Sequence, residues 1–332
     1  MSGLFVHKHV EAVRAQGAEV RVIHSQGWCD LWQQWKDLQR EGWMPDIVQL
    51  NVIQKQGFLA LWLKKKYGIP YVILDHWSGY LPENGAFRRF GVIKKRLMRL
   101  IGRQSEGIFT VSQKLQTSMS DCGFEAKQWG TIDNVVDDFF FGHSDDKEKE
   151  DIKTLLHVCC FDERAKNVKG LLRAAKMLSE RRQDWRLVLV GFGPDWKEIH
   201  DFAWNLHFPT GMVCWTGELT PEEVADEMHR ADALVLSSRY ETYGVVLAEA
   251  VAAGLPILST PVGIAEEIGA LIVPQEIAQY KPGKFAEFIE TILWNTEYRV
   301  QNTELMSAKR FTTEAIGKKL IGIYDCCLHH DI

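Results

Sequence analysis

The stretch Glu241-Thr-Tyr-Gly-Val-Val-Leu-Ala-Glu249 places two carboxylates eight positions apart, around a glycine. An apolar run typical of a buried strand, Ala231–Ser238, precedes it, and a second such run, Pro256–Thr260, follows. We therefore expect the stretch at the carboxyl end of a strand and in the first turns of a helix, where open α/β sheets bind ligands. Helix-start amides favour a phosphate, and a carboxylate can accept hydrogen bonds from sugar hydroxyls.

The composition is that of an ordinary globular protein with more than one core. The chain has 332 residues, of which 46% are hydrophobic and 25% charged, and this length favours two domains. No apolar run is long enough to cross a bilayer, and no signal peptide is recognised. Seven cysteines without a CxxC pair predict reduced thiols and a cytoplasmic protein. The formal net charge of −5 argues against a nucleic-acid partner.

Lysine and arginine concentrate in residues 88–103, where apolar residues are interleaved with them. Such a basic amphipathic helix can lie on an anionic membrane surface, here the inner face of the cell membrane. The alternative is a helix that packs on its own domain and keeps its basic face in water.

Strand-like and helix-like segments alternate along the chain, which is typical of βαβ units on parallel sheets. In the first half, strands are expected at Glu19–His24, Ile47–Asn51, Tyr71–Leu74 and Gly107–Val111, with helices near 4–16, 57–67, 88–103 and 112–121. In the second half, strands are expected at Thr154–Cys159, Arg186–Val190, Met212–Trp215 and Ala233–Leu236, with a helix near 167–181. An acidic stretch, His143–Asp151, separates them as a linker. The prediction is two Rossmann-like domains, 1–150 and 151–310.

The first domain opens directly in its first predicted helix, although a Rossmann half normally opens on a central strand. We expect a strand and a glycine-rich loop to lie upstream of Met1 in the native gene. The upstream reading frame tests this expectation.

Three further residues follow predicted strands of the second half. Lys166 stands just before a helix, where its ammonium can reach a diphosphate as a point charge, although an isolated lysine is more often a surface residue. Gly191 and Gly193 form a turn directly after the strand that ends at Val190. A lone GxG is a weak signal by itself. Together these residues indicate one ligand site at the carboxyl edge of one sheet.

In this order, the motifs resemble those of the family 4 retaining glycosyltransferases of the GT-B fold. The matching pieces are His157-Val-Cys-Cys-Phe with Lys166-Asn, Val190-Gly-Phe-Gly-Pro194, and the Glu241–Glu249 stretch with Gly254-Leu-Pro256. In the first half they are Asp75-His76-Trp77-Ser78-Gly79, Phe109-Thr-Val-Ser112 and Asn134-Val-Val-Asp137. The resemblance implies two parallel-sheet domains that face each other across a cleft, with residues 311–332 returning as a helix to the first domain.

The resemblance also implies roles for individual residues. Glu249 is expected to bind the ribose of a nucleotide diphosphate sugar, and Glu241 the hydroxyls of the transferred sugar. The amides of Tyr243, Gly244 and Val245 would meet the diphosphate, and Lys166 would stabilise its charge. The remaining expected donor contacts are Gly191, Gly193, Leu219 and Arg164. On the acceptor side His76 is the expected catalytic residue, with Trp77, Ser78, Gly79 and Asn51 near it.

One residue departs from the family pattern. Cys160 stands where the family usually carries an arginine, so Lys166 would hold the diphosphate alone or with Arg164. The sequence has no Asp-x-Asp motif and no His/Cys cluster at metal-ligand spacing, and His7 and His9 are expected at the surface. These features predict transfer that needs neither a metal nor a bound cofactor.

The sequence thus predicts a retaining glycosyltransferase that moves a sugar from a nucleotide diphosphate donor to a glycan or lipid-linked acceptor in cell-surface polysaccharide biosynthesis. Two alternatives remain open. A nucleotide-sugar epimerase also uses Rossmann halves but needs acid and base groups around the sugar. A catalytically weak relative that acts as a binding or assembly subunit is compatible with Cys160.

Overall fold

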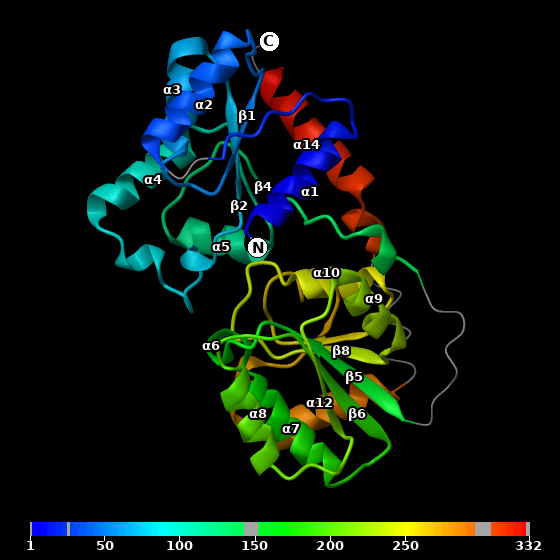
Figure 1. Ribbon diagram of the computed structural model, residues 1–332. Helices are drawn as coiled ribbons and strands as arrows, with labels where there is room; N and C mark the ends of the chain where they lie inside the picture. The colour runs from blue at the N-terminus through cyan, green and yellow to red at the C-terminus, as the bar shows by residue number, and fades with distance from the viewer. Residues whose placement is uncertain (1, 25–26, 143–151, 296–306, 330–332) are drawn as a thin grey trace. The chain divides into compact units, whose positions relative to one another are not determined.

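The chain folds into two compact units (Figure 1). The computed structural model describes residues 2–24, 27–142, 152–295 and 307–329. Unit 1 comprises Met1–Val135 and Phe311–Ile332, and unit 2 comprises Val136–Arg310. Each unit has its own parallel sheet with helices packed on it, so the predicted α/β class is confirmed. The predicted linker, His143–Asp151, lies outside the described residues.

Unit 1 is built on a four-stranded sheet in the order β1-β2-β3-β4. The strands are β1 Val48–Asn51, β2 Tyr71–Asp75, β3 Gly107–Thr110 and β4 Trp129–Thr131. The helices are α1 Ser2–Arg14, α2 Trp28–Arg40, α3 Gly57–Tyr67, α4 Val92–Gln104, α5 Gln113–Asp121 and α14 Thr313–Leu328, with short 3₁₀ turns at Ser78–Tyr80 and Phe87–Arg89. A further 3₁₀ turn, Ala308–Phe311, includes the last residues of unit 2 and the first residue of the second segment of unit 1. All neighbouring strands run parallel.

Two helix layers cover the sheet of unit 1. Helices α1 and α14 lie side by side on one face, and α2 and α3 lie on the other (Figure 1). Gly317 of α14 permits the close approach of α1, because a Cβ at this position would lie 2.3 Å from the carbonyl oxygen of Ala12. The tail of the chain is therefore an integral layer of unit 1.

The predicted strand at Glu19–His24 is wrong. These residues carry no strand pairing, and two of their carbonyls are bound by side chains instead: Arg14 donates to Val20 and Gln34 donates to His24. Among the described residues, β1 pairs with β2 alone, so no neighbouring strand offers the segment a ladder of hydrogen bonds. The expectation of a further strand upstream stays a prediction.

Helices of unit 1 differ from the prediction in two places. The sequence pattern missed α2, although Leu31 and Trp35 are buried one turn apart on its inner face. The helix predicted near 88–103 is present as α4, but its predicted start is wrong, because the chain is extended at Phe90 and Gly91. Arg88 and Arg89 therefore belong to a 3₁₀ turn, and α4 begins only at Val92.

Unit 2 has a six-stranded parallel sheet in the order β10-β9-β8-β5-β6-β7. The strands are β5 Lys153–Val158, β6 Trp185–Val190, β7 Val213–Gly217, β8 Ala233–Leu236, β9 Ile257–Ser259 and β10 Leu271–Ile272. The helices are α6 Glu163–Lys166, α7 Val168–Ser179, α8 Trp196–Asn205, α9 Pro221–Arg230, α10 Val245–Ala252, α11 Gln275–Tyr280 and α12 Pro282–Trp294, and a 3₁₀ turn lies at Asp138–Phe140. Helices α7, α8 and α12 lie on one face of this sheet, and α9 and α10 lie on the other (Figure 1).

The strand order of unit 2 contains one topological switch point. From β5 the chain proceeds outward through β6 to β7, then returns to β8 on the other side of β5 and proceeds outward again. Loops that leave the carboxyl ends of β5 and β8 therefore separate on opposite faces, and ligands of open α/β sheets bind in the resulting crevice. Lys166 lies in the segment after β5 and Glu241 in the loop after β8.

Candidate functional site

The segments after β5 and β8 meet through an ion pair. Lys166 Nζ lies 2.5 Å from Glu241 Oε1, and both side chains keep only 16% of their surface exposed. Ser238 donates a second hydrogen bond to the same carboxylate oxygen, at 2.8 Å. Two residues 75 positions apart in the chain thus form an ion pair at the switch point.

Backbone contacts fix the position of this pair. The Ser237 hydroxyl donates to the carbonyl of Lys166 at 2.9 Å, and the backbone N–H of Arg239 donates to Ala165 at 2.7 Å. The guanidinium of Arg239 also contacts the Glu163 carbonyl and donates to the side chain of Asn167. Asn167 adopts a left-handed conformation, with φ 51°, at the junction of α6 and α7. Ser237 and Arg239, which follow β8, therefore hold the backbone of α6 around Lys166 in place.

Burial and charge act on Lys166 in opposite directions. Burial lowers the pKa of the ammonium, whereas the adjacent Glu241 carboxylate raises it through its charge and a hydrogen bond, and the net shift is upward. Lys166 consequently stays protonated across the physiological range. A charged group of this kind can stabilise the negative charge of a phosphate.

Helix α10 starts directly beside the pair. Gly244 forms its N-cap with φ 78°, a conformation that favours glycine, and a Cβ there would lie 2.9 Å from the side chain of Leu247. Tyr243 is buried, and its carbonyl accepts a hydrogen bond from Ile264. Val245 is the first helical residue. The first amides of a helix have no intrahelical acceptor, so the end of α10 is suited to an anion.

Glu249 lies one turn further along α10 and is half-buried. Glu241 and Glu249 thus differ in setting, since the first is in the loop and bound to Lys166, whereas the second is on the helix. This arrangement agrees with the predicted strand, loop and helix around the opening stretch.

The glycines after β6 have a structural role in the fold. Gly191 has φ 126°, and a Cβ at this position would lie 2.0 Å from the carbonyl oxygen of Cys159. A Cβ at Gly193 would lie 2.5 Å from the backbone nitrogen of Phe161. The β6 loop therefore packs directly on the β5 loop, and this packing is sufficient to explain both glycines without a ligand.

Three other predicted positions border this region. Arg164 is exposed on α6 at the mouth of the β5 loop, and its carbonyl accepts a hydrogen bond from Arg239. Leu219 is half-buried after β7. Cys160 is exposed, whereas its neighbour Cys159 is mostly buried. No described contact joins the Arg164 side chain to Lys166, so its predicted role as a second cation stays a prediction.

His157 is a further polar residue at the centre of this sheet. It is fully buried near the carboxyl end of β5, and its Nδ1 donates to the carbonyl of Val235 at 2.8 Å. Its Nε2 has no hydrogen-bond partner among the described residues. Burial lowers the pKa of His157 to about 4, so the imidazole is neutral at physiological pH.

In unit 1, the predicted acceptor-side loop is organised by Asp75. This fully buried carboxylate accepts hydrogen bonds from the backbone N–H of Ile53 at 3.1 Å and of Trp77 at 2.9 Å, and from the Tyr80 hydroxyl at 3.3 Å. Asp75 therefore joins the loop after β1 to the loop after β2. Burial raises the pKa of Asp75, and the hydrogen bonds and the neighbouring His76 oppose that shift.

The predicted residues of this loop have different surroundings. His76 is half-buried, and burial lowers its pKa although Asp75 opposes the shift. Trp77 stacks on Phe90 with ring centroids 5.6 Å apart, and Gly79 leaves room for the indole, because a Cβ there would lie 2.1 Å from the Trp77 ring. Ser78 accepts a hydrogen bond from Asn84.

Asn51 ends β1, where its side-chain oxygen accepts a hydrogen bond from Gln49. The next residue, Val52, adopts φ 65°. A β-branched residue is strained in the left-handed region, so the surrounding structure must hold this backbone in place. The N–H of Val52 donates to Leu74, and that of Ile53 donates to Asp75.

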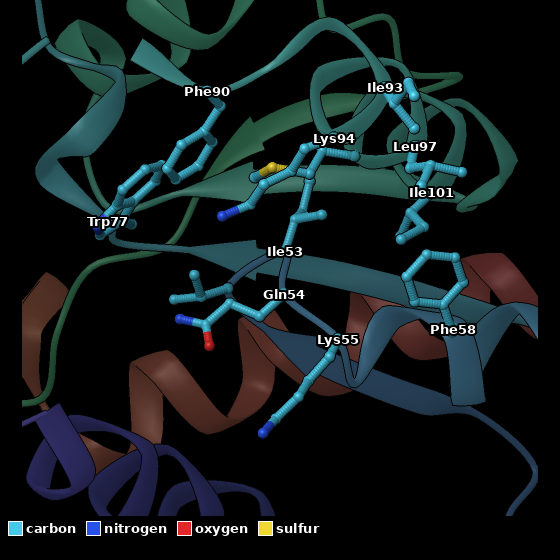
Figure 2. A pocket seen from close by; sticks show the side chains of 12 residues that line it. Ile53, Gln54, Lys55, Phe58, Trp77, Phe90, Ile93, Lys94, Leu97 and Ile101 are labelled. Atoms are coloured by element: carbon cyan, nitrogen blue, oxygen red, sulfur yellow. The ribbon is translucent and has the colours of Figure 1, made fainter. Parts of the chain in front are cut away.

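A cavity of about 790 Å³ lies beside these loops (Figure 2). Residues from the loops after β1 and β2, from α3, and from α4 line it, among them Val52, Ile53, Phe58, Trp77, Phe90 and Leu97. Trp77 is the predicted acceptor-side residue that lines this cavity. The other cavity residues were missed in the sequence, because apolar residues after a strand and along a helix do not differ from core residues.

Arg239 and Asp75 were also not assigned a role from the sequence. The available signal for both is a charged residue at or shortly after the end of a buried strand, since Asp75 is the last residue of β2 and Arg239 shortly follows β8. The prediction that His9 lies at the surface is wrong, because His9 is buried and its Nε2 contacts the carbonyl of Asp133 at 3.1 Å. His7 is exposed as expected.

The described residues contain neither a cluster suited to a metal ion nor a helix suited to span a membrane. Within the ranges that the structure describes, no group of three or more His, Cys, Asp or Glu side chains is arranged to hold a metal ion. Over the same part of the chain, no helix combines the length and apolar character required to cross a membrane.

Comparison with known proteins places both halves in one class. Residues 5–138 match the model "Glycosyltransferase Family 4", and residues 141–304 match "Glycosyl transferases group 1". The chain belongs to the family 4 glycosyltransferases of the GT-B fold.

Individual relatives agree with this assignment. N-acetyl-alpha-D-glucosaminyl L-malate synthase of Bacillus anthracis is 31% identical over 52% of this chain and 46% of its own length. Alpha-monoglucosyldiacylglycerol synthase of Streptococcus pneumoniae is 23% identical over 64% of this chain and 51% of its own length. The crystal structure of Anabaena HepE in complex with UDP superimposes with a TM-score of 0.72 at 19% identity, over 89% of this chain and 82% of that one. The chain spans about half the length of the curated relatives it matches.

Proposed function

We propose that the protein is a retaining glycosyltransferase that moves a sugar from a nucleotide diphosphate sugar to a glycan or lipid-linked acceptor in cell-surface polysaccharide biosynthesis. The observation that carries the proposal is the Lys166–Glu241 pair at the switch point of unit 2, beside the start of α10. A buried cation, helix-start amides and a carboxylate are the groups that a sugar diphosphate requires. Membership of a family of glycosyltransferases and the UDP bound to HepE support the same chemistry.

In the proposed site, the diphosphate lies at the start of α10 and meets the amides of Tyr243, Gly244 and Val245. Lys166 compensates the charge that develops on the leaving diphosphate, so the protein itself supplies the cation. Glu241 binds hydroxyls of the transferred sugar, and Glu249 binds the ribose. Gly191, Gly193, Leu219 and Arg164 border the site.

The proposed reaction keeps the configuration at the anomeric carbon. The bond between this carbon and the diphosphate oxygen breaks, and the acceptor hydroxyl forms a new bond on the same face of the sugar. The hydroxyl proton passes to the departing phosphate oxygen, so no strong protein base is required. On the acceptor side, His76 is neutral because burial lowers its pKa, and it can hydrogen-bond an acceptor or sugar hydroxyl.

We also propose that α4 attaches the protein to the inner face of the cell membrane. Val92 and Ile93 are exposed by 64% and 76%, and lysines and arginines flank them on the same helix. Exposed apolar side chains among cations match an anionic lipid surface. Replacement of Val92 by Glu should lower co-sedimentation with anionic vesicles several-fold. Trp204→Glu, at a 78% exposed residue of unit 2, is the control and should leave it unchanged.

A panel of labelled nucleotide sugars with lipid-linked and free glycan acceptors tests the proposed function. Radiolabel in the acceptor, with the anomeric configuration of the donor, is the expected result. Epimerised free nucleotide sugar would assign the protein to the epimerases instead. Nucleotide-sugar binding without any turnover would favour a binding or assembly subunit. The exposed Cys160, at a position where the family usually carries an arginine, is the observation that favours this alternative.

A further inference from the structure

The cavity of unit 1 has a lining that indicates the chemistry of its ligand (Figure 2). Phe58, Leu97 and Ile101 lie at one end, and the stacked rings of Trp77 and Phe90 lie at the other. The polar side chains of the lining are Gln54, Lys55 and Lys94, and no carboxylate is among them. A glycan alone would require many more hydrogen-bonding partners, whereas a hydrocarbon chain with one anionic group matches this lining.

Lys94 supplies the positive charge at the ring end of the cavity. Its ammonium lies 3.3 Å from the centroid of the Phe90 ring, which in turn stacks on Trp77. An aromatic ring binds a cation through its face, so Phe90 holds Lys94 beside the cavity and leaves the remaining N–H donors of the ammonium available to a phosphate.

The wall that α4 contributes continues onto the protein surface. Ile93 and Leu97 line the cavity and also remain exposed by 76% and 38%. Val92 and Leu100 are exposed on the same helix but do not line the cavity. A hydrocarbon chain can therefore enter over α4 with its apolar surface covered, since the rim itself is apolar.

The opposite wall is held in shape by hydrogen bonds within the protein. Val52 adopts φ 65°, and the hydrogen bond from Ile53 to the buried Asp75 holds the strained segment. Because Asp75 also binds the N–H of Trp77, one carboxylate positions two walls of the cavity. A site whose walls are already ordered loses less conformational entropy on binding.

We propose that this cavity binds the acceptor through the hydrocarbon chain of a lipid phosphate, with the Lys94 ammonium at the phosphate. The proposal rests on the proposed function in one respect, because it names the acceptor class of that reaction as a lipid-linked phosphate rather than a free glycan. Binding to the cavity itself does not depend on sugar transfer.

Titration with octyl, decyl and dodecyl phosphate below their micelle concentrations, without nucleotide sugar, tests the proposal by calorimetry. Each further buried methylene should raise the affinity about fourfold, and decanol should bind more weakly than decyl phosphate. The whole chain is used, and vesicles are left out so that adsorption to a membrane does not contribute.

Two matched pairs of variants locate the binding. Leu97→Glu should weaken decyl phosphate binding at least about tenfold, and Leu100→Glu, on the same helix at 37% exposure, should leave it unchanged. Lys94→Gln should remove the preference for decyl phosphate over decanol, and Arg96→Gln, which does not line the cavity, should keep it. The thermal midpoints of all four variants show whether each is folded.

The outcomes separate the proposal from adsorption and from the proposed function. Equal losses in Leu97→Glu and Leu100→Glu would show surface adsorption by α4, and no binding to the wild type or no dependence on chain length would equally overturn the proposal. A photoreactive alkyl phosphate that labels the cavity residues provides a readout for any variant that fails to fold. Binding without sugar transfer would refute the proposed function alone, and transfer without alkyl phosphate binding would refute this inference alone.

Discussion

At the scale of single residues, the Lys166–Glu241 pair is the feature with the largest consequence. Both partners are largely buried, and removal of one leaves the other charge in a poorly solvated place. Because Lys166 Nζ contacts Glu241 Oε1, a bound sugar would compete with Lys166 for this carboxylate. The strength of the ion pair would therefore affect how readily Glu241 takes its proposed role.

Glu241→Gln should reduce kcat/KM by about 10-fold to 150-fold, because a hydrogen bond to a charged carboxylate contributes about 1.5–3 kcal/mol. The amide keeps the shape of the side chain, so the fold should survive. Steady-state kinetics and circular dichroism measure the two effects. Glu198→Gln, at an exposed carboxylate on α8, is the control. Activity like that of the wild type in Glu241→Gln would exclude the role proposed for this residue.

His157 gives unit 2 a dependence of stability on pH. Its pKa is about 4 in the folded protein and near 6.5 in the unfolded chain, so the unfolded chain binds the proton more tightly. Stability should therefore fall as the pH falls from 6.5 to 4, by about 3 kcal/mol in total from this residue. Urea unfolding of the wild type and of His157→Gln measures the effect. An unchanged pH slope in the variant would show that other groups cause it.

At the scale of secondary-structure elements, close backbone contacts decide the packing. The β6 loop rests on the β5 loop through Gly191 and Gly193, and α14 rests on α1 through Gly317. Each contact depends on a missing Cβ, and each joins segments that lie far apart in the sequence. The first contact shapes the proposed donor site, and the second completes the helix layer of unit 1.

Helix α14 offers a matched test of this packing. Gly317→Ala should destabilise unit 1 by about 1–3 kcal/mol, since the new Cβ would lie 2.3 Å from the Ala12 carbonyl. Gly322→Ala in the same helix meets no atom within 4 Å, and it should stabilise the helix by about 0.5–1 kcal/mol. Thermal unfolding of both variants measures the difference. A similar change in the thermal midpoint of both variants would mean that the contact between α1 and α14 does not limit the stability of unit 1.

At the scale of the whole molecule, the two units have separate cores and separate candidate sites. A ligand that binds one folded unit stabilises that unit according to its concentration relative to the dissociation constant. The donor and the acceptor should therefore protect different segments of the chain from hydrogen–deuterium exchange.

Hydrogen–deuterium exchange over the whole chain can identify the segments that each ligand protects. A nucleoside diphosphate at about 100 times its dissociation constant should stabilise the folded site by about 2.7 kcal/mol and slow exchange in the segments after β5 and β8 and at the start of α10. Lys166→Ala should remove most of this protection, whereas Lys197→Ala, on α8, should retain it. Protection confined to unit 1 would place the nucleotide elsewhere.

Sequence alone predicted most of the elements of both units. The apolar runs, glycine turns and helical periods are local properties of the chain, and they predicted many of the elements near their observed bounds, for example α3 at Gly57–Tyr67 and β8 at Ala233–Leu236. The segment Glu19–His24 was predicted wrongly from the same kind of pattern. A strand requires a partner, and the pattern of one segment does not show whether a partner is present.

Some features of the candidate sites likewise follow from the local sequence, whereas others depend on contacts between distant residues. The sequence by itself determined that Lys166, Gly244 and Glu241 follow strands and precede helices, because local patterning fixes where a strand ends and a helix begins. Only the tertiary structure decided that Lys166 pairs with Glu241, that Asp75 joins two loops, and that a cavity lies beside Trp77. These features depend on residues far apart in the chain, and the strand order that brings them together is a property of the whole sheet.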